Sequence, residues 1–219
     1  VYLIFMSIGT LFGIGGTSVI SRALGEGKKE KARKSCAFCF WGCVFVGILL
    51  VAFILIFINP ILNLIGASAD TYEYAKSYLS IIVFAGPFVL ISNCYGNVIR
   101  TEGDSGKAML GLLLGNLVNV ILDPIFILAL GLDIKGAAIA TVIGNIVGAG
   151  FYISYFLKGK SMLSIRLKDF TVKQGIAASV LAIGVPAALG DALMSVSHII
   201  SNSQMAHYGD MAVVGMTGL

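Results

Sequence analysis

The chain has 219 residues, of which 58% are hydrophobic and only 12% are charged, and its formal net charge is +4. Soluble domains are about one quarter charged, and a soluble core of this size would not bury so many apolar side chains, whose mean hydropathy over the chain is +0.95. The composition excludes an ordinary cytosolic enzyme, a nucleic-acid-binding module and a disordered chain, and it predicts a polytopic transmembrane helical bundle of the all-α class.

Six apolar runs are long enough to cross a bilayer, which takes about 20 residues per helix. The runs are continuous rather than alternating, and this pattern favours helices over the strands of a barrel. In chain order they are Val1–Ser21, Ser35–Ile58, Tyr74–Ile99, Ala108–Gly131, Ala137–Leu157 and Gly175–Ala206. Because the sequence starts inside an apolar run with no initiator Met, we expect it to be a piece of a longer protein.

Lys and Arg are concentrated in alternate connections between these runs. The first, third and fifth connections contain nearly all of them: Arg22, Lys28, Lys29, Lys31, Arg33, Lys34, Arg100, Lys107, Lys158, Lys160, Arg166, Lys168 and Lys173. The positive-inside rule then places these three connections in the cytoplasm. The basic residues are typical of topogenic signals that also contact anionic headgroups, so membrane lipid is an expected partner and nucleic acid is not.

Ionisable side chains inside a bilayer are costly and mark functional sites. Three lie deep in the expected spans, namely Asp123 in the fourth and Asp191 and His198 in the sixth. Asp191, His198 and Asn202 share a helix face, so they are candidate cavity-lining residues. For His198 the alternative to a proton relay is a buried neutral imidazole. Pro186 is a candidate hinge of the sixth span.

Asp123 has the most informative neighbours. Asn119 lies one turn earlier on the same helix face, and Pro124 has no N–H to offer the carbonyl of Val120. Carboxylate, amide and free carbonyl oxygens suit Na⁺ or, at a desolvated carboxyl, a proton. Thr141 in the next span can add a hydroxyl. The alternative is that Asn119 and Asp123 only bind neighbouring helices by hydrogen bonds, and that Pro124 only kinks the helix.

Other polar residues of the spans are interpreted as side chains that hold helices together by hydrogen bonds. They are Ser92, Asn93, Asn97, Asn116 and Asn145.

Several stretches carry a family resemblance. Gly16–Gly27 is a small-residue span end that contains a Ser-Arg-x-x-Gly turn. Asn119–Thr141 combines Asn-x-x-x-Asp-Pro with a Gly-rich turn and the start of the next span. Gly184–Ala188 reads Gly-Val-Pro-Ala-Ala, and Arg100–Gly103 forms another matching turn. Together, over nearly the whole chain, these stretches resemble the multidrug and toxic compound extrusion (MATE) family of cation-coupled exporters.

The resemblance implies a MATE-type fold with two six-helix bundles related by a pseudo-twofold axis. On this map the chain covers about the second to the seventh helix. Residues 1–157 are the N-terminal bundle without its first helix, 158–174 are a cytoplasmic linker between bundles, and 175–219 begin the C-terminal bundle.

The resemblance also implies a function. The intact protein is expected to be no enzyme but a monomeric multi-pass antiporter of the cell membrane, exporting amphipathic, drug-like organic cations. It would use Na⁺ or H⁺ as coupling ion and no cofactor. The family's cation ligands match Asn119, Asp123 and Thr141. Met194 stands where some branches have Glu, which favours a first-bundle mechanism, as in the DinF-like branch.

Three alternatives stay open. The piece itself could be a structural or non-transporting fragment, because the partner bundle that alternating access needs is missing from it. A lipid-linked oligosaccharide flippase of the same wider superfamily would need Arg or Lys inside the spans to bind pyrophosphate, and no expected span has one deep inside it. A membrane-embedded enzyme would need a constellation such as His-Glu-x-x-His, which the sequence lacks.

Overall fold

The computed structural model describes residues 2–65, 69–159, 161–172 and 175–206, with side chains except for 63–65, 69–71, 195–196 and 198–206. Within these ranges the regular structure is entirely helical. The α-helices are α1 (Tyr2–Gly25), α2 (Lys29–Ile56), α3 (Ile58–Ile65), α4 (Ala69–Ile82), α5 (Gly86–Thr101), α6 (Ser105–Pro124), α7 (Asp133–Leu157) and α8 (Ile176–Ala206). The shorter turns are η1 (Val83–Ala85), η2 (Ile125–Ala129) and η3 (Leu167–Asp169).

Six helical segments of the described chain are long and apolar enough to span a membrane. They are Tyr2–Gly25, Lys29–Ile56, Tyr72–Thr101, Ser105–Ala129, Asp133–Leu157 and Ile176–Met194. Each overlaps one of the apolar runs found in the sequence, so the prediction of an all-α polytopic membrane protein is confirmed.

Two local features differ from the sequence expectation, and both involve proline. The expected third span is divided by η1, because Pro87 has no N–H to bond the carbonyl of Val83, which Gly86 binds instead. The expected second connection contains the short helix α3. Pro60 lies in the first turn of α3, where a proline removes an N–H that has no helical partner anyway.

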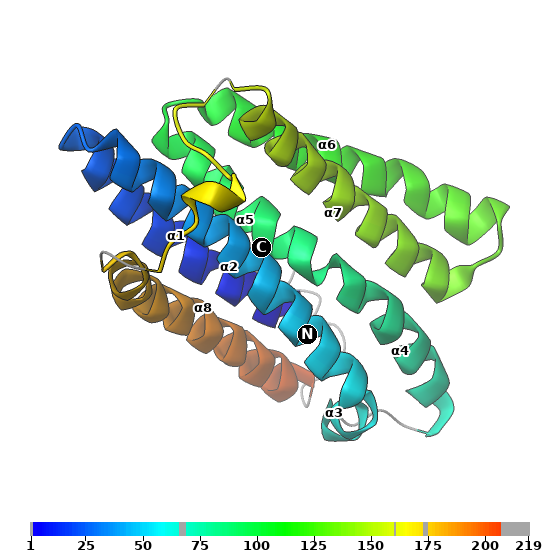
Figure 1. Cartoon of the computed structure of the whole chain (residues 1–219). Helices are drawn as coiled ribbons and strands as arrows, with labels where there is room; N and C mark the ends of the chain where they lie inside the picture. Colours follow the sequence, from blue (N-terminus) through cyan, green and yellow to red (C-terminus); the bar gives the residue numbers. More distant parts are fainter. Residues whose placement is uncertain (1, 66–68, 160, 173–174, 207–219) are drawn as a thin grey trace.

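The helices pack around α1 and α5. In Figure 1, α8 lies along α1, while α6 and α7 form a pair on the other side of α5. The contact between α1 and α8 brings their backbones together: a Cβ on Gly184 would lie 2.2 Å from the carbonyl oxygen of Leu11, and one on Gly15 would lie 2.3 Å from that of Val180. Small residues at such crossings are typical of helix pairs in membranes.

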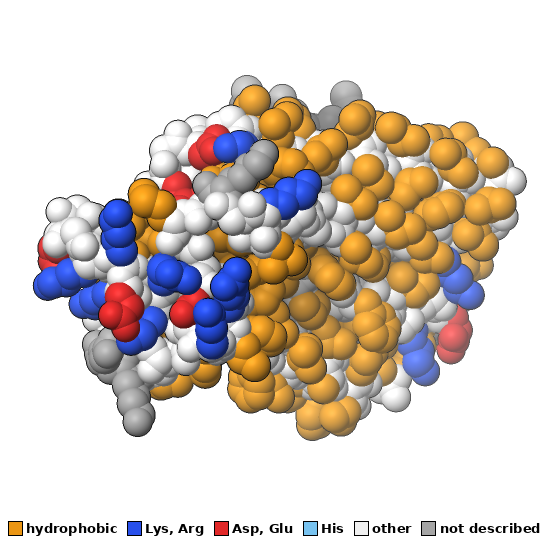
Figure 2. Space-filling model, turned by 45° about the horizontal axis from the view of Figure 1, so that its top comes forward, with side chains coloured by type: hydrophobic (Ala, Val, Ile, Leu, Met, Phe, Trp, Pro, Cys, Tyr) orange, Lys and Arg blue, Asp and Glu red, His pale blue; other side chains and the backbone are white. Residues whose placement is uncertain are grey.

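The three basic connections meet at one end of the bundle. Figure 2 shows Lys and Arg side chains concentrated at this end and a broad hydrophobic surface beyond it. The Ser161 hydroxyl donates a hydrogen bond to Glu102 (Oγ to Oε1, 2.6 Å), and the rings of Phe38 and Phe170 stack 6.2 Å apart. The fifth connection therefore folds back onto the ends of α2 and α5. Its assignment as a linker between bundles stays a prediction, and 207–219 lie outside the described residues.

The orientation in the membrane can be tested with introduced cysteines. We expect Lys29→Cys in the intact protein to react with an impermeant thiol reagent only from the cytoplasmic side, because Lys29 is exposed at the basic end. Lys135→Cys, at the opposite end, is the matched control and should react only from outside. The native thiols Cys36, Cys39, Cys43 and Cys94 are each 0% exposed and give little background. Labelling of Lys29→Cys from outside would overturn the orientation.

Candidate functional site

The candidate site begins at the close contact between α6 and α7. A Cβ on Gly144 would lie 2.7 Å from the carbonyl oxygen of Gly115 and 3.1 Å from the Cβ of Asn119. On the other side, a Cβ on Gly115 would lie 3.0 Å from the carbonyl oxygen of Gly144. The absence of side chains at both positions lets the two backbones touch, and this contact brings Asn119 of α6 next to Thr141 of α7.

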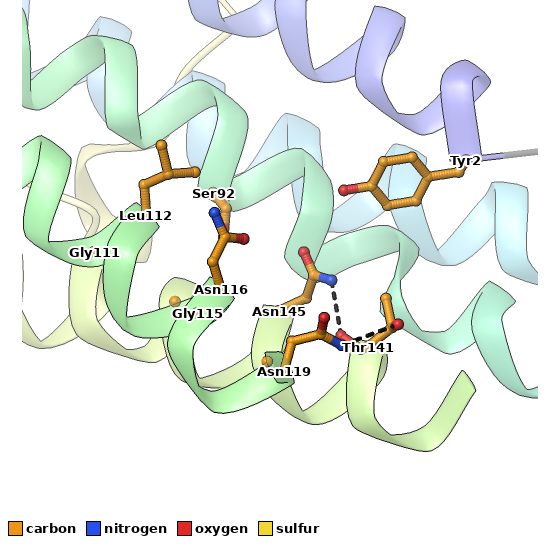
Figure 3. A pocket seen from close by; sticks show the side chains of 11 residues that line it. Tyr2, Ser92, Gly111, Leu112, Gly115, Asn116, Asn119, Thr141 and Asn145 are labelled. Atoms are coloured by element: carbon orange, nitrogen blue, oxygen red, sulfur yellow. Dashed lines mark hydrogen bonds between the residues drawn. The ribbon is translucent and has the colours of Figure 1, made fainter. Parts of the chain in front are cut away.

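Asn119 and Thr141 form a direct hydrogen bond (Figure 3). The amide nitrogen of Asn119 donates to the hydroxyl of Thr141 (Nδ2 to Oγ1, 3.2 Å), and this hydroxyl donates to the carbonyl of Ala137 at 2.9 Å. Asn145 donates from its Nδ2 to the carbonyl of Thr141 at 2.8 Å. Among the described residues, no donor binds Asn119 Oδ1, so this oxygen is free to coordinate a cation.

Asp123 lies one turn after Asn119, in the last turn of α6. Its carboxylate oxygen Oδ1 is buried and has no hydrogen-bond partner in the described part of the chain. An unpaired buried acceptor of this kind costs on the order of 1–3 kcal/mol, and more when it is charged. The structure thus brings two of the three predicted ligands into contact and places the third one turn away with an unsatisfied oxygen.

The helix changes its geometry next to Asp123. The α-helical part ends at Pro124, and η2 continues as a π-turn in which the N–H of Leu130 bonds the carbonyl of Ile125 at 3.0 Å. π-turns are rare and are frequently found at functional sites. The regular α-helix therefore ends at Pro124, while the action of Pro124 as a hinge stays a prediction.

Two adjoining cavities of about 170 Å³ and about 210 Å³ lie between α1, α5, α6 and α7. They share five lining residues, Tyr2, Ser92, Leu112, Asn116 and Asn145, and we call them together the amide cleft. Its other polar lining residues are Asn93, Asn97, Asn119, Thr141, Arg100 and Tyr152. Figure 3 shows the Tyr2 hydroxyl and the amides of Asn116 and Asn145 pointing into it. Asp123 does not line the amide cleft.

The sequence interpretation missed the amide cleft. Five of its residues were taken only as contacts between helices, and for some of them this is correct: Asn93 Nδ2 donates to the carbonyl of Met6 at 3.1 Å. The sequence did contain a signal, because Asn93 and Asn97 share a helix face, as do Thr141 and Asn145. Only the packing of α5 against α6 and α7 shows that these faces converge on one cavity.

The candidate residues of the last span lie elsewhere. Asp191 is on the exposed side of α8 and does not line the amide cleft. The side chains of His198 and Asn202 lie outside the described residues. Helix α8 runs through Pro186 without interruption, so a hinge at this proline stays a prediction.

Comparisons with known proteins identify the family of the chain. The profile of the MatE family matches residues 1–125. The multidrug export protein MepA of Staphylococcus aureus is 32% identical over 213 residues, which cover 97% of this chain and 47% of MepA. The chain thus spans about half the length of the curated relatives that it matches.

Solved structures of transporters superpose on the chain over nearly its whole length. A MATE transporter in complex with MaL6 superposes with a TM-score of 0.91 at 28% identity, over 99% of this chain and 48% of that one. A MOP superfamily transporter from Pyrococcus furiosus superposes with a TM-score of 0.88 at 28% identity, over 99% of this chain and 48% of that one. The latter is described as having a binding pocket of reverse polarity that suggests a different function.

Proposed function

The chain belongs to the MatE family, and from this premise we propose that the intact protein exports drug-like small molecules across the cell membrane in exchange for Na⁺ or H⁺. The family match, the six candidate spans and the export function in the name of its relative MepA support this proposal. The relatives are named as export proteins and not as enzymes.

The observation that supports ion coupling best is the buried, unpaired oxygen of Asp123 next to the bonded pair Asn119 and Thr141. In a membrane, such a group gains strongly from a bound cation, because little water is present to solvate it. Na⁺ would take oxygen ligands from Asp123, Asn119 and Thr141, and a proton would neutralise Asp123 alone. Both outcomes remove the unsatisfied charge.

Ion binding can drive export only if the ion prefers one conformation. We propose that the outward-facing state binds the ion near Asp123 and that the helix shifts around Pro124 and η2. The shift would displace the substrate from the amide cleft, and the inward-facing state would then release the ion into the cytoplasm. In this scheme Asp123 senses the ion while the amide cleft contacts the substrate.

The cleft also supports the substrate class. Its two cavities, of about 170 Å³ and about 210 Å³, adjoin one another and approach the range of about 300–1,000 Å³ that is typical of small-molecule sites. Amide and hydroxyl groups can accept many different polar compounds, which suits drug-like substrates. The preference for amphipathic organic cations and the monomeric state rest on the family resemblance. A lipid-linked oligosaccharide flippase is not favoured, because the matching relatives are multidrug export proteins.

The test uses the intact protein in proteoliposomes. A Na⁺ gradient and, separately, a pH gradient are imposed while the efflux of a fluorescent organic cation is followed. We expect one of the two gradients to drive export, and that gradient identifies the coupling ion. Absence of transport under both gradients, with protein correctly inserted, would contradict the proposal.

Asn119→Ala and Thr141→Ala should weaken the ion dependence of transport more than substrate binding. Each variant removes one neutral oxygen ligand or hydrogen bond, worth about 1 kcal/mol, so the half-saturating ion concentration should rise roughly fivefold. Asn116→Ala is the matched control, because Asn116 points into the cleft from the same helix but does not bond Thr141. If all three variants changed the half-saturating ion concentration and the substrate affinity equally, the cause would be a general packing defect instead.

A further inference from the structure

The amide cleft has a single charged lining residue among the side chains that the structure describes. This residue is Arg100, in the last turn of α5, at the end of the bundle where the basic connections meet. All other lining side chains of the two cavities are amides, hydroxyls, tyrosines, apolar groups or glycines. The cleft is therefore neutral along its length and positive at one mouth.

Arg100 has no carboxylate partner in the part of the chain that the structure describes. Its guanidinium makes no salt bridge or side-chain hydrogen bond to another described residue, although two acidic residues follow it closely in the chain. Glu102 accepts hydrogen bonds from the Ser161 hydroxyl (2.6 Å) and the Met162 N–H (3.2 Å) instead. Asp104 pairs with Lys107. Both acids thus bind other groups, and Arg100 has no ionic partner within the described ranges.

The surroundings of Arg100 in the cleft do not compete for its charge either. Tyr152 uses its hydroxyl to donate to the carbonyl of Ala108 at 2.6 Å, and the nearby Asn97 donates to the carbonyl of Asn93 at 3.0 Å. A guanidinium presents five donors in a planar fork that matches an oxyanion in two parallel bonds. Arg100 is itself exposed, so water screens part of this attraction, and the match between the fork and the oxyanion supplies the selectivity.

We propose that Arg100 is a specificity-determining residue that binds the carboxylate of amphipathic compounds entering the amide cleft. Arg100 would then distinguish compounds that carry a carboxylate from otherwise similar compounds that lack one. The role of Arg100 in selecting exported compounds rests on the proposed export function. The binding step itself depends only on the cleft and can be measured without transport.

The same guanidinium could bind another source of oxyanions, because a cytoplasmic arginine also meets the phosphates of lipid headgroups. The two sources of oxyanions predict different effects of Arg100 on the binding of different compounds. A substrate carboxylate makes Arg100 distinguish between compounds that differ in that group. A headgroup contact would affect all compounds alike and would depend on the lipid.

Binding is measured first, with the purified intact protein in a neutral detergent and two fluorescent dyes that differ in one group. Rhodamine 110 has a free carboxylate, and rhodamine 123 is its methyl ester. For Arg100→Gln we expect the Kd of rhodamine 110 to rise at least about tenfold, as for loss of a charge-assisted pair, and that of rhodamine 123 to change less than about twofold. Arg100→Lys should be intermediate, since an ammonium keeps the charge without the fork.

The control is Arg22→Gln, which removes a cation at the same end of the bundle but outside the cleft. We expect it to change neither Kd. The proposal is wrong if Arg100→Gln raises the Kd of both dyes equally or of neither. It is also wrong if the unmodified protein binds no rhodamine 110.

Transport then separates this proposal from the export function. In phosphatidylcholine proteoliposomes, Arg100→Gln should reduce the export of rhodamine 110 but not of rhodamine 123. An equal effect on both dyes that appears only with phosphatidylglycerol would assign Arg100 to lipid headgroups and overturn the proposal. Selective binding without export of either dye would leave Arg100 as a carboxylate site and contradict the export function instead.

Discussion

Asp123→Asn should abolish gradient-driven export by the intact protein while leaving its amount in the membrane unchanged. The amide has nearly the shape of the carboxylate, but it binds no proton and offers Na⁺ no charge. Electrostatic interactions of full charges inside a bundle are worth several kcal/mol, so we expect at least a roughly hundredfold loss of coupled transport. The buried, unpaired oxygen of Asp123 is the structural reason for such a large effect.

The measurement is dye efflux from proteoliposomes under the gradient that drives the unmodified protein. Asp133→Asn is the matched control, because Asp133 is exposed at the start of α7 and away from the cleft. Its backbone has a positive φ of 46°, a conformation that Asn tolerates as well as Asp does. Normal gradient-driven export by Asp123→Asn would remove this residue from the mechanism.

The sequence predicts the membrane fold well because the bilayer leaves few choices. Apolar length and the need to satisfy the backbone within each segment identify the helices without any knowledge of packing. The alternation of Lys and Arg predicts which connections lie together, and the structure places the three basic connections at one end of the bundle (Figure 1). The short helix α3 and the turn η1 were not predicted, because apolar length alone does not show where a helix starts anew or changes its hydrogen bonding next to a proline.

The candidate site is predictable only in part. Asn119 and Asp123 belong to one helix, so their shared face follows from helical spacing alone. Their approach to Thr141 was expected from family resemblance and not from physics, since it depends on the contact of Gly115 with Gly144. The amide cleft and the isolated charge of Arg100 depend on four helices at once. No periodicity within a single segment carries that information.

Gly144→Ala should reduce both stability and ion coupling, the second large effect that we expect. A methyl group at this position would lie 2.7 Å from the carbonyl oxygen of Gly115 and 3.1 Å from the Cβ of Asn119. Backbone cannot yield as a flexible side chain does, so α6 and α7 must separate. Overpacking of this kind costs about 1–3 kcal/mol, and the separation stretches the bond between Asn119 and Thr141.

The effect is measured as the melting temperature of the purified intact protein and the ion dependence of its transport. Gly150→Ala is the control on the same helix, because a Cβ there meets nothing within 4 Å. Since alanine favours helices over glycine by about 1 kcal/mol, the control should be neutral or slightly stabilising. If both variants behave alike, the contact between α6 and α7 does not hold the site together.

A double variant shows whether the loss of stability comes from the contact between Gly115 and Gly144. Gly115→Ala should also destabilise, since its Cβ would lie 3.0 Å from the carbonyl oxygen of Gly144. Once one methyl group has separated the helices, the second fits into the gap. Gly115→Ala with Gly144→Ala should therefore lower the melting temperature by less than the sum of the single changes, as expected for residues in contact. Strict additivity would mean that each glycine acts through its own helix, and that the position of Thr141 next to Asn119 has another cause.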